Sequence, residues 1–277
     1  MIKPYSTLAY RARSNLPTPE HRGIMEFELS TLLLLTLSAL GAGFIDAIAG
    51  GGGLITLPVL LSVGLSPTQA LATNKLQASF GSFSATCYFL RRGHIDLGSA
   101  RWAIAMTFIG SAAGTLLVQR LNAELLQRLL PFLLMAFALY FLLSPKVGAQ
   151  EGRRRVTPRR FACTAALGIG GYDGFFGPGT GSFFALAYVL LAGYNLTRAT
   201  AHSKLLNFTS NLAALLFFCL GGQVVWLAGL CMAAGQFIGA RLGSRLVLKQ
   251  GSRIIRPLIV TMSLALSAKL LFTQYGS

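Results

Sequence analysis

The stretch Gly43-Phe44-Ile45-Asp46-Ala47-Ile48-Ala49-Gly50-Gly51-Gly52-Gly53 decides the fold, because an aspartate and four glycines interrupt an otherwise apolar run. A carboxylate inside a bilayer costs at least about 2.5 kcal/mol, so an acid kept there needs a reason. Non-helical backbone at membrane depth is tolerated only where protein or a water-filled cavity supplies hydrogen-bond partners. We therefore expect this break to mark the functional centre of a membrane protein.

A second stretch of the same kind is Tyr172-Asp173-Gly174-Phe175-Phe176-Gly177-Pro178-Gly179-Thr180-Gly181-Ser182. Comparing the sequence with itself at a shift of 129 residues pairs Lys75 with Lys204, and one residue of slippage superposes the glycine runs. Asp46 and Asp173 then fall near one another. A fixed internal period indicates repeats. We expect two related halves, residues 25–145 and 161–277, joined by a basic linker at residues 146–160.

The composition is that of a protein dissolved in a lipid bilayer. Of the 277 residues, 53% are hydrophobic and 12% are charged, whereas an ordinary soluble domain carries roughly 25% charged residues. The formal net charge of +16 comes from basic residues that cluster between apolar runs, as the positive-inside rule describes for cytoplasmic loops. Because no basic face or RNA-binding signature is present, we expect no nucleic-acid partner.

The apolar runs predict an all-α polytopic membrane protein with about eight transmembrane helices. Runs long enough, or nearly so, to cross a hydrocarbon core of about 30 Å are Leu29 to Ile45, Leu76 to Leu90, Trp102 to Gln119, Leu129 to Ser144, Phe161 to Tyr172, Leu205 to Leu220, Val224 to Ala240 and Pro257 to Ala268. Two further segments, Leu54 to Gly64 and Ser182 to Ala192, are too short to span alone and each follows a glycine cluster. Such pieces are typical of broken or re-entrant helices.

Equivalent loops of the two halves differ in charge, which bears on orientation. Arg91 to Arg101 is basic and its counterpart around residues 221–223 is uncharged, whereas Arg241 to Arg256 is basic and its counterpart near Asn122 is sparsely charged. Inverted repeats produce this pattern. If both short segments cross, each half has five crossings, both termini lie outside and the linker lies in the cytoplasm. The alternative that the short segments dip in and return stays open.

The N-terminal residues 1–24 are polar, carry three prolines and contain no apolar core of a signal peptide. We expect a disordered tail there, or a start codon assigned too early, with Met25 directly ahead of the first span.

Asp46 and Asp173 are the acids that lie inside apolar segments. An ionisable residue at that depth suggests proton coupling or gating. The alternative is a structural acid that caps a helix or pairs with a lysine.

Lys75 and Lys204 occupy the same place in each repeat, next to the polar residues Asn74 and His202. Two cations related by the repeat could flank a central anion. The alternative is that each lysine snorkels to the membrane surface from a helix end. His202 could titrate near neutral pH or could be a hydrogen-bonded interior histidine.

Each glycine run opens a short helix, whose free N–H groups and positive dipole end attract an anion. The candidate binding glycines are Gly50, Gly51, Gly52, Gly53, Gly177, Gly179 and Gly181. The alternative is tight helix packing, which is also our interpretation of Gly110-x-x-x-Gly114 and Gly235-x-x-x-Gly239-x-x-x-Gly243.

Enzyme chemistry leaves no signature in this sequence. No catalytic triad or nucleotide motif stands out, and the four cysteines show no paired spacing. We expect no enzyme activity, no cofactor and no metal.

The first stretch, with Pro58 and Ala70-Leu71-Ala72-Thr73-Asn74-Lys75, resembles the first-repeat signature of the TauE/SafE sulfite exporter family. Tyr172 to Ser182, with Thr200-Ala201-His202-Ser203-Lys204, resembles its second signature, particularly in the YfcA-like bacterial branch. The resemblance runs from about Phe27 to Leu271. It implies a multi-pass protein of the cell inner membrane that transports small anions, namely sulfite, sulfonates and related organosulfur compounds, driven by the proton gradient.

We therefore expect alternating access around a midplane site, where the glycine turns, Lys75 and Lys204 hold the anion and Asp46 or Asp173 couples a proton. The alternatives are a passive anion channel, a membrane-embedded enzyme or a structural partner in sulfur metabolism. Assembly into a homo-oligomer stays open as well.

Overall fold

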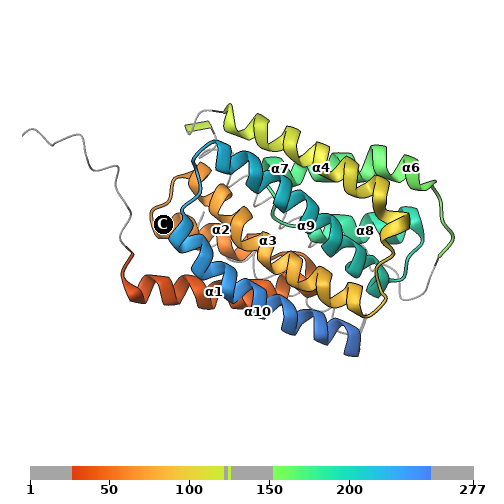
Figure 1. Cartoon of the computed structure of the whole chain (residues 1–277), viewed down its shortest axis with the longest axis horizontal. Helices are drawn as coiled ribbons and strands as arrows, with labels where there is room; N and C mark the ends of the chain where they lie inside the picture. The colour runs from red at the N-terminus through yellow and green to blue at the C-terminus, as the bar shows by residue number, and fades with distance from the viewer. Residues whose placement is uncertain (1–26, 122–123, 126–151, 251–277) are drawn as a thin grey trace, which may run out of the picture.

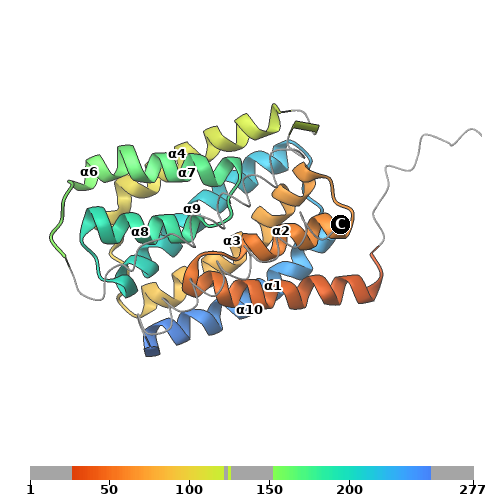
Figure 2. The same cartoon turned by 180° about the vertical axis from the view of Figure 1, so that it is seen from behind.

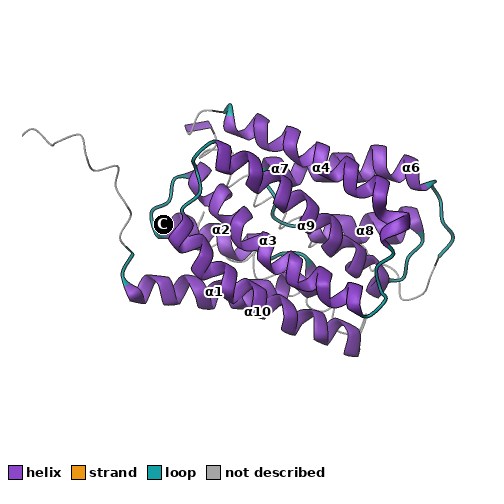
Figure 3. Ribbon diagram, viewed as in Figure 1, coloured by secondary structure: helices purple, strands orange, loops and turns teal. Residues whose placement is uncertain are grey.

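The computed structural model describes residues 27–121, 124–125 and 152–250, and every regular element in these ranges is a helix (Figure 3). The first half contributes α1 (Leu29–Ala49), α2 (Gly53–Ser62), α3 (Pro67–Arg91) and α4 (Leu97–Gln119). The second half contributes α6 (Pro158–Phe161), the π-helical turn η1 (Ala162–Ala166), α7 (Leu167–Phe175), α8 (Thr180–Ala192), α9 (Leu196–Leu220) and α10 (Trp226–Gln250). The predicted all-α class is confirmed.

Three of these helices, α1, α4 and α9, are long and apolar enough to cross a membrane. The helices α3 and α10 have 25 residues each, about 37 Å at 1.5 Å per residue. The elements α6, η1 and α7 follow one another without a break from Pro158 to Phe175. The predicted spans at residues 129–144 and 257–268, the tail at residues 1–24 and residues 146–151 of the linker lie outside the described residues.

The two short segments form short helices, as predicted. Helix α2 has 10 residues and α8 has 13, so they are about 15 and 20 Å long and neither crosses a core of about 30 Å. One boundary was predicted wrongly, because residues 241–250 of the expected basic loop are the last turns of α10. Arg241, Arg245 and Lys249 are spaced four residues apart and so share one helix face, and the guanidinium of Arg241 lies 4.8 Å from the ring centroid of Tyr88.

The two halves are interlocked. Figures 1 and 2 show α1 beside α10 and α4 beside α7, with α3 and α9 in the middle of the bundle. Helix α1 therefore packs against the last described helix of the second half, and α7, which continues from α6 and η1, packs against α4 of the first half.

The glycine patterns make this interlocking close. Cβ atoms built at Gly235, Gly239 and Gly243 would lie 2.2, 2.0 and 2.3 Å from carbonyl oxygens of α1. Cβ atoms at Gly110 and Gly114 would lie 2.2 and 2.0 Å from carbonyl oxygens of α7. Such distances are impossible for a real side chain, so the prediction of close helix contacts at both patterns is confirmed.

The distribution of side chains suits a hydrocarbon solvent. Large apolar residues face outward on several helices, for example Leu33, Leu37, Leu117 and Ile238, each more than half exposed. Polar residues, including both lysines of the repeat, are buried in the bundle. In lipid, charged and polar groups are stable only in such an interior.

The basic segments gather at one end of the molecule. The α3–α4 turn, the start of α6, the start of α9 and the end of α10 all lie toward the right-hand end in Figure 1. These segments carry Arg91, Arg92, Arg101, Arg153, Arg154, Arg155, Arg159, Arg160, Arg198, Arg245 and Lys249. Loops predicted from charge to share one side of the membrane therefore lie together in space.

The glycine contacts predict the effect of one added methyl group. Gly239→Ala should lower the free energy of unfolding by about 1–3 kcal/mol, because its Cβ would overlap the carbonyl oxygen of Leu40. Thermal unfolding of the detergent-purified protein measures the loss. Gly41→Ala is the matched control: it lies in α1, and a Cβ built there would have no neighbouring atom within 4 Å, so we expect no loss or a small gain. Equal losses for the two variants would contradict the packing argument.

Candidate functional site

Two glycine turns interrupt the helices at the centre of the bundle. Gly50 ends α1 with φ of 79°, and Gly177 and Gly179 between α7 and α8 have φ of 101° and 85°. These are left-handed conformations, which only glycine adopts without cost. One turn connects α1 to α2, and the other connects α7 to α8. Each short helix therefore begins directly after a glycine turn.

The two turns touch each other. A Cβ built on Gly50 would lie 2.3 Å from the backbone nitrogen of Ser182, and one built on Gly181 would lie 2.8 Å from the Cα of Gly50. The hydroxyl of Ser182 donates a hydrogen bond to the carbonyl of Ala49. The two breaks that superpose in the sequence therefore also meet in space.

Two ion pairs cross between the halves beside these turns. The Nζ of Lys75 lies 2.8 Å from Oδ1 of Asp173, and the Nζ of Lys204 lies 2.9 Å from Oδ2 of Asp46. Each lysine also donates to the backbone carbonyl of its partner aspartate. Both lysine side chains are 1% exposed, so the interpretation that they snorkel to the surface is wrong.

Further hydrogen bonds hold the carboxylates. The backbone N–H of Gly52 donates to Oδ1 of Asp46 at 3.1 Å, and the hydroxyl of Thr180 donates to Oδ1 of Asp173 at 2.9 Å. A buried ion pair is stable only if such additional hydrogen bonds offset the loss of hydration. Among the described residues, Oδ2 of Asp173 has no hydrogen-bond partner.

A small cavity of about 20 Å³ lies between the ion pairs. It has room for about one water molecule, less than an oxyanion needs. Its lining consists of the two aspartates, glycines of the turns, Lys75, Ala78 and three asparagines, namely Asp46, Asp173, Gly50, Gly53, Gly177, Gly179, Gly181, Lys75, Ala78, Asn74, Asn207 and Asn211. An anion can enter this site only if the ion pairs separate.

The structure brings most of the predicted residues together. Lys204 joins the cavity through its pair with Asp46, and Gly52 supports the same carboxylate. Gly51 is not part of the lining. His202 lies in a different pocket, near the basic end of the bundle.

Asn207 and Asn211 were not predicted as site residues. They stand three and seven positions after Lys204, which places all three on one helix face. This helical spacing from Lys204 is the sequence feature that could have identified both asparagines as neighbours of the site. The Nδ2 of Asn211 donates to Oδ1 of Asn207 at 3.0 Å.

The site is asymmetric, although the repeat relates its lysines. At the repeat shift, Asn207 corresponds to Ala78 and Asn74 corresponds to Ser203. Oδ1 of Asn74 accepts hydrogen bonds from the hydroxyl of Thr56 at 2.6 Å and from Nε2 of Gln77 at 2.7 Å. The second half therefore presents more amide groups to the cavity than the first.

Comparison with known proteins shows the family of the chain. The family model for the sulfite exporter TauE/SafE matches residues 35–270. The chain belongs to this family. It is 55% identical to the probable membrane transporter protein YfcA of Escherichia coli over 90% of this chain and 94% of the relative.

Two further relatives of this TauE/SafE protein have lower sequence identity to it. It is 46% identical to a probable membrane transporter protein of Haemophilus influenzae, over 90% of this chain and 98% of that protein. It is 30% identical to sulfite exporter TauE/SafE family protein 1 of Arabidopsis thaliana over 33% of this chain and 21% of that protein. No solved structure matches the chain.

The ion pairs predict a strong coupling between their partners. Asp46→Asn leaves the ammonium of Lys204 buried without a counter-charge, so we expect a loss of about 3–5 kcal/mol in the free energy of unfolding. The double variant Asp46→Asn/Lys204→Met should lose less than the sum of its single changes. Denaturant unfolding in detergent measures the cycle. Glu28→Gln, at an exposed acid before α1, is the control and should change little. Additive losses in the cycle would contradict the pairing.

Proposed function

We propose that the protein is a carrier of small oxyanions, such as sulfite or a sulfonate, that couples anion movement to protons by alternating access. The observation that carries the proposal is the crossed arrangement of two buried lysine–aspartate pairs around two glycine turns. It combines cations that can hold an anion with acids that can hold a proton.

Charge balance links the binding of the anion to the binding of a proton. An anion that binds Lys75 or Lys204 must displace the carboxylate that now pairs with that lysine. The displaced carboxylate would be left as a second buried negative charge, which is costly in a low-dielectric interior. Protonation of the aspartate removes that cost, so one anion and one proton bind more easily together than either binds alone.

The small cavity fits a closed state of such a carrier. With room for about one water molecule, it leaves no space for an anion between the ion pairs, as expected of a carrier between its two open states. The N-termini of α2 and α8, which are the positive ends of their helix dipoles, lie at the two turns. In transporters, such half-helix N-termini point at anionic substrate groups.

We further infer two inverted repeats, about eight spans and a multi-pass position in the cell inner membrane. The reciprocal packing of α1 on α10 and of α7 on α4 supports the repeats, as does the opposite direction of α3 and α9 in Figure 1. The basic end would face the cytoplasm, in keeping with the positive-inside rule. Names of relatives, membrane transporter and sulfite exporter, agree with this function.

Flux measurements test the proposal. Purified protein in liposomes should take up an alkyl sulfonate or sulfite in a saturable manner, and an imposed proton gradient should drive accumulation. The variant Lys75→Ala/Lys204→Ala should lose this flux, whereas Lys249→Ala, at an exposed lysine on α10, should retain it. The neutral pair variant Lys75→Met/Asp173→Asn separates lost function from lost folding. Unchanged flux in both site variants, or flux that ignores the proton gradient, would contradict the proposal.

The linkage also predicts a pH dependence of binding. An alkyl sulfonate keeps its charge between mildly acidic and mildly alkaline pH, so any change in affinity reports on the protein. Since binding requires a protonated aspartate, the affinity should rise as the pH falls, and the protein should take up a proton on binding. Heat protection by the sulfonate at several pH values measures the effect. In a folded Asp46→Asn/Asp173→Asn variant the pH dependence should vanish; its persistence would assign the proton to another group.

A further inference from the structure

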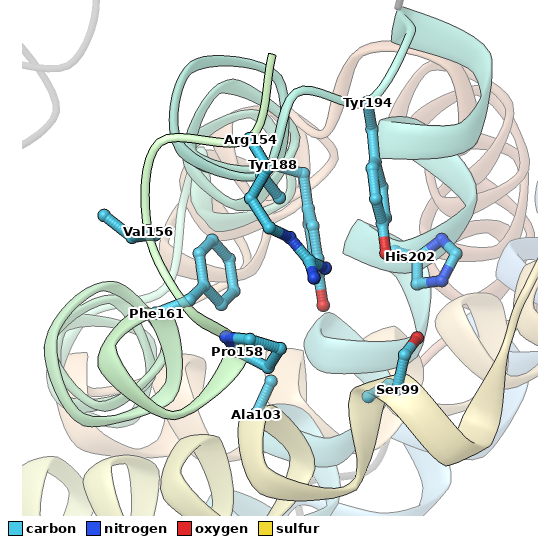
Figure 4. A pocket seen from close by; sticks show the side chains of 11 residues that line it. Ser99, Ala103, Arg154, Val156, Pro158, Phe161, Tyr188, Tyr194 and His202 are labelled. Atoms are coloured by element: carbon cyan, nitrogen blue, oxygen red, sulfur yellow. The ribbon is translucent and has the colours of Figure 1, made fainter. Parts of the chain in front are cut away.

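A second pocket opens at the basic end of the bundle, apart from the central cavity (Figure 4). Its outer part has a volume of about 430 Å³ and lies between the start of α4, residues 152–154 and the start of α9. A narrow inner part of about 20 Å³ continues from it and reaches Tyr188 and His202. Ser99, Arg154 and Tyr194 line both parts.

Among the described residues that line the outer part, basic side chains outnumber acidic ones. Arg154 and Arg198 line it, and Asp96 is the carboxylate beside them. Oδ1 of Asp96 already accepts the backbone N–H groups of Gly98 and Ser99 at 3.0 and 3.3 Å. Hydrogen bonds from Ser99 lower the pKa of Asp96, so this acid stays ionised as the cap of α4.

The two arginines are held differently. Arg154 forms no ion pair with any residue in the described ranges, and its side chain points into the pocket in Figure 4. The guanidinium of Arg198 lies 4.2 Å from the ring centroid of Tyr194. This stacking holds the guanidinium of Arg198 against the wall of the pocket that Tyr194 forms.

Tyr188 places a polar group at the bottom of the pocket. The residue is 4% exposed, and its hydroxyl has no hydrogen-bond partner within the described part of the chain. Its ring is fixed by Phe161, Tyr194 and His202, with centroid distances of 4.6, 5.3 and 5.3 Å. A buried hydroxyl without a partner costs free energy, so a fixed hydroxyl that faces a pocket points to a ligand that accepts its hydrogen bond.

His202 supports this pocket and does not bind the ligand directly. Its Nε2 accepts the backbone N–H of Asp96 at 3.3 Å, and its Nδ1 donates to the carbonyl of Arg198 at 3.0 Å. Both ring nitrogens are therefore used. The imidazole ties the start of α4 to the start of α9 and so positions Arg198 beside Asp96.

We propose that this pocket is a second oxyanion site, in which Arg154 and the hydroxyl of Tyr188 bind a sulfonate, sulfite or phosphate group. One oxygen of the ligand fits the narrow inner part beside Tyr188, and the rest of the group lies in the outer part beside Arg154. Tyr188 stands seven positions after Gly181 of the central cavity in α8, about 10 Å along a helix. The inference stands on this pocket alone and holds whether or not the protein transports the anion.

Fluorine NMR titration with trifluoromethanesulfonate tests the site, using the full chain in phosphatidylcholine nanodiscs. Arg154→Gln should raise the Kd about tenfold, because it removes a charge-assisted hydrogen bond. Arg153→Gln, at an exposed neighbour outside the pocket lining, should change the Kd less than about twofold, within the value of a rim charge. Equal weakening by both variants would show attraction to a basic surface and would overturn the proposal.

Tyr188→Phe removes the hydroxyl and keeps the ring. We expect unchanged or higher thermal stability, because an unpartnered buried hydroxyl is lost, together with a Kd raised about fivefold. An unchanged Kd in this folded variant would overturn the proposal. The central variant Lys75→Met/Asp173→Asn should keep the binding that depends on Arg154, and its loss there would place the ligand in the central cavity.

The oxyanion could also be a lipid phosphate, since basic pockets at the cytoplasmic side bind anionic headgroups. Nanodiscs with phosphatidylglycerol distinguish the two sources. Competition between this lipid and the sulfonate, weakened by Arg154→Gln, would support an oxyanion site filled by a headgroup. An unchanged sulfonate Kd would support a site for soluble anions.

Discussion

The structure depends on the pairing of four charges inside an apolar bundle. Two ammonium groups and two carboxylates lie within 2.8 to 2.9 Å of one another in pairs, in surroundings where an unpaired charge is very costly. The need to pair them explains the interruptions of the helices. The turn at Gly50 frees the amide of Gly52 to bind Asp46, and the turn at Gly177 brings Thr180 onto Asp173. An unbroken helix could supply neither group, because its amides and its direction are already committed.

The pairs also connect the two halves in a reciprocal manner. Each half gives one lysine and one aspartate, and each pair crosses from one half to the other. The glycine contacts of α10 with α1 and of α4 with α7 follow the same crossed pattern. A movement of one half relative to the other must therefore disturb both pairs, and any ligand that separates the pairs favours such a movement. In the proposed carrier, ligand binding and conformational change would be linked through the same four charges.

The two polar regions of the bundle have different physical characters. The central cavity is small, neutral through internal pairing and lined by glycine backbone and asparagine amides. The pocket at the basic end is larger and open, with aromatic rings that fix one hydroxyl and one imidazole in place. Helices α8 and α9 contribute to both, since α8 starts at the central turn and ends near Tyr194, and α9 carries His202 and Lys204. Each of these two helices therefore contributes residues to both regions.

The sequence by itself determined the helical class, the short helices after the glycine runs, the glycine packing patterns and most of the residues that gather around the central cavity. These features are local or periodic in the sequence. The length of an apolar run, a glycine cluster that interrupts it and a charged residue inside it can each be recognised without knowing the tertiary structure. Only the tertiary structure decided which lysine meets which aspartate, because the partners are 98 and 158 residues apart and lie in opposite halves. The tertiary structure also places His202 at the basic end of the bundle, away from the central cavity, and places Asn207 and Asn211 in the lining of that cavity. How deeply a side chain is buried, which residue it contacts and where it points all depend on how the helices pack. Helix packing involves segments that are far apart in the sequence, so no single segment predicts it.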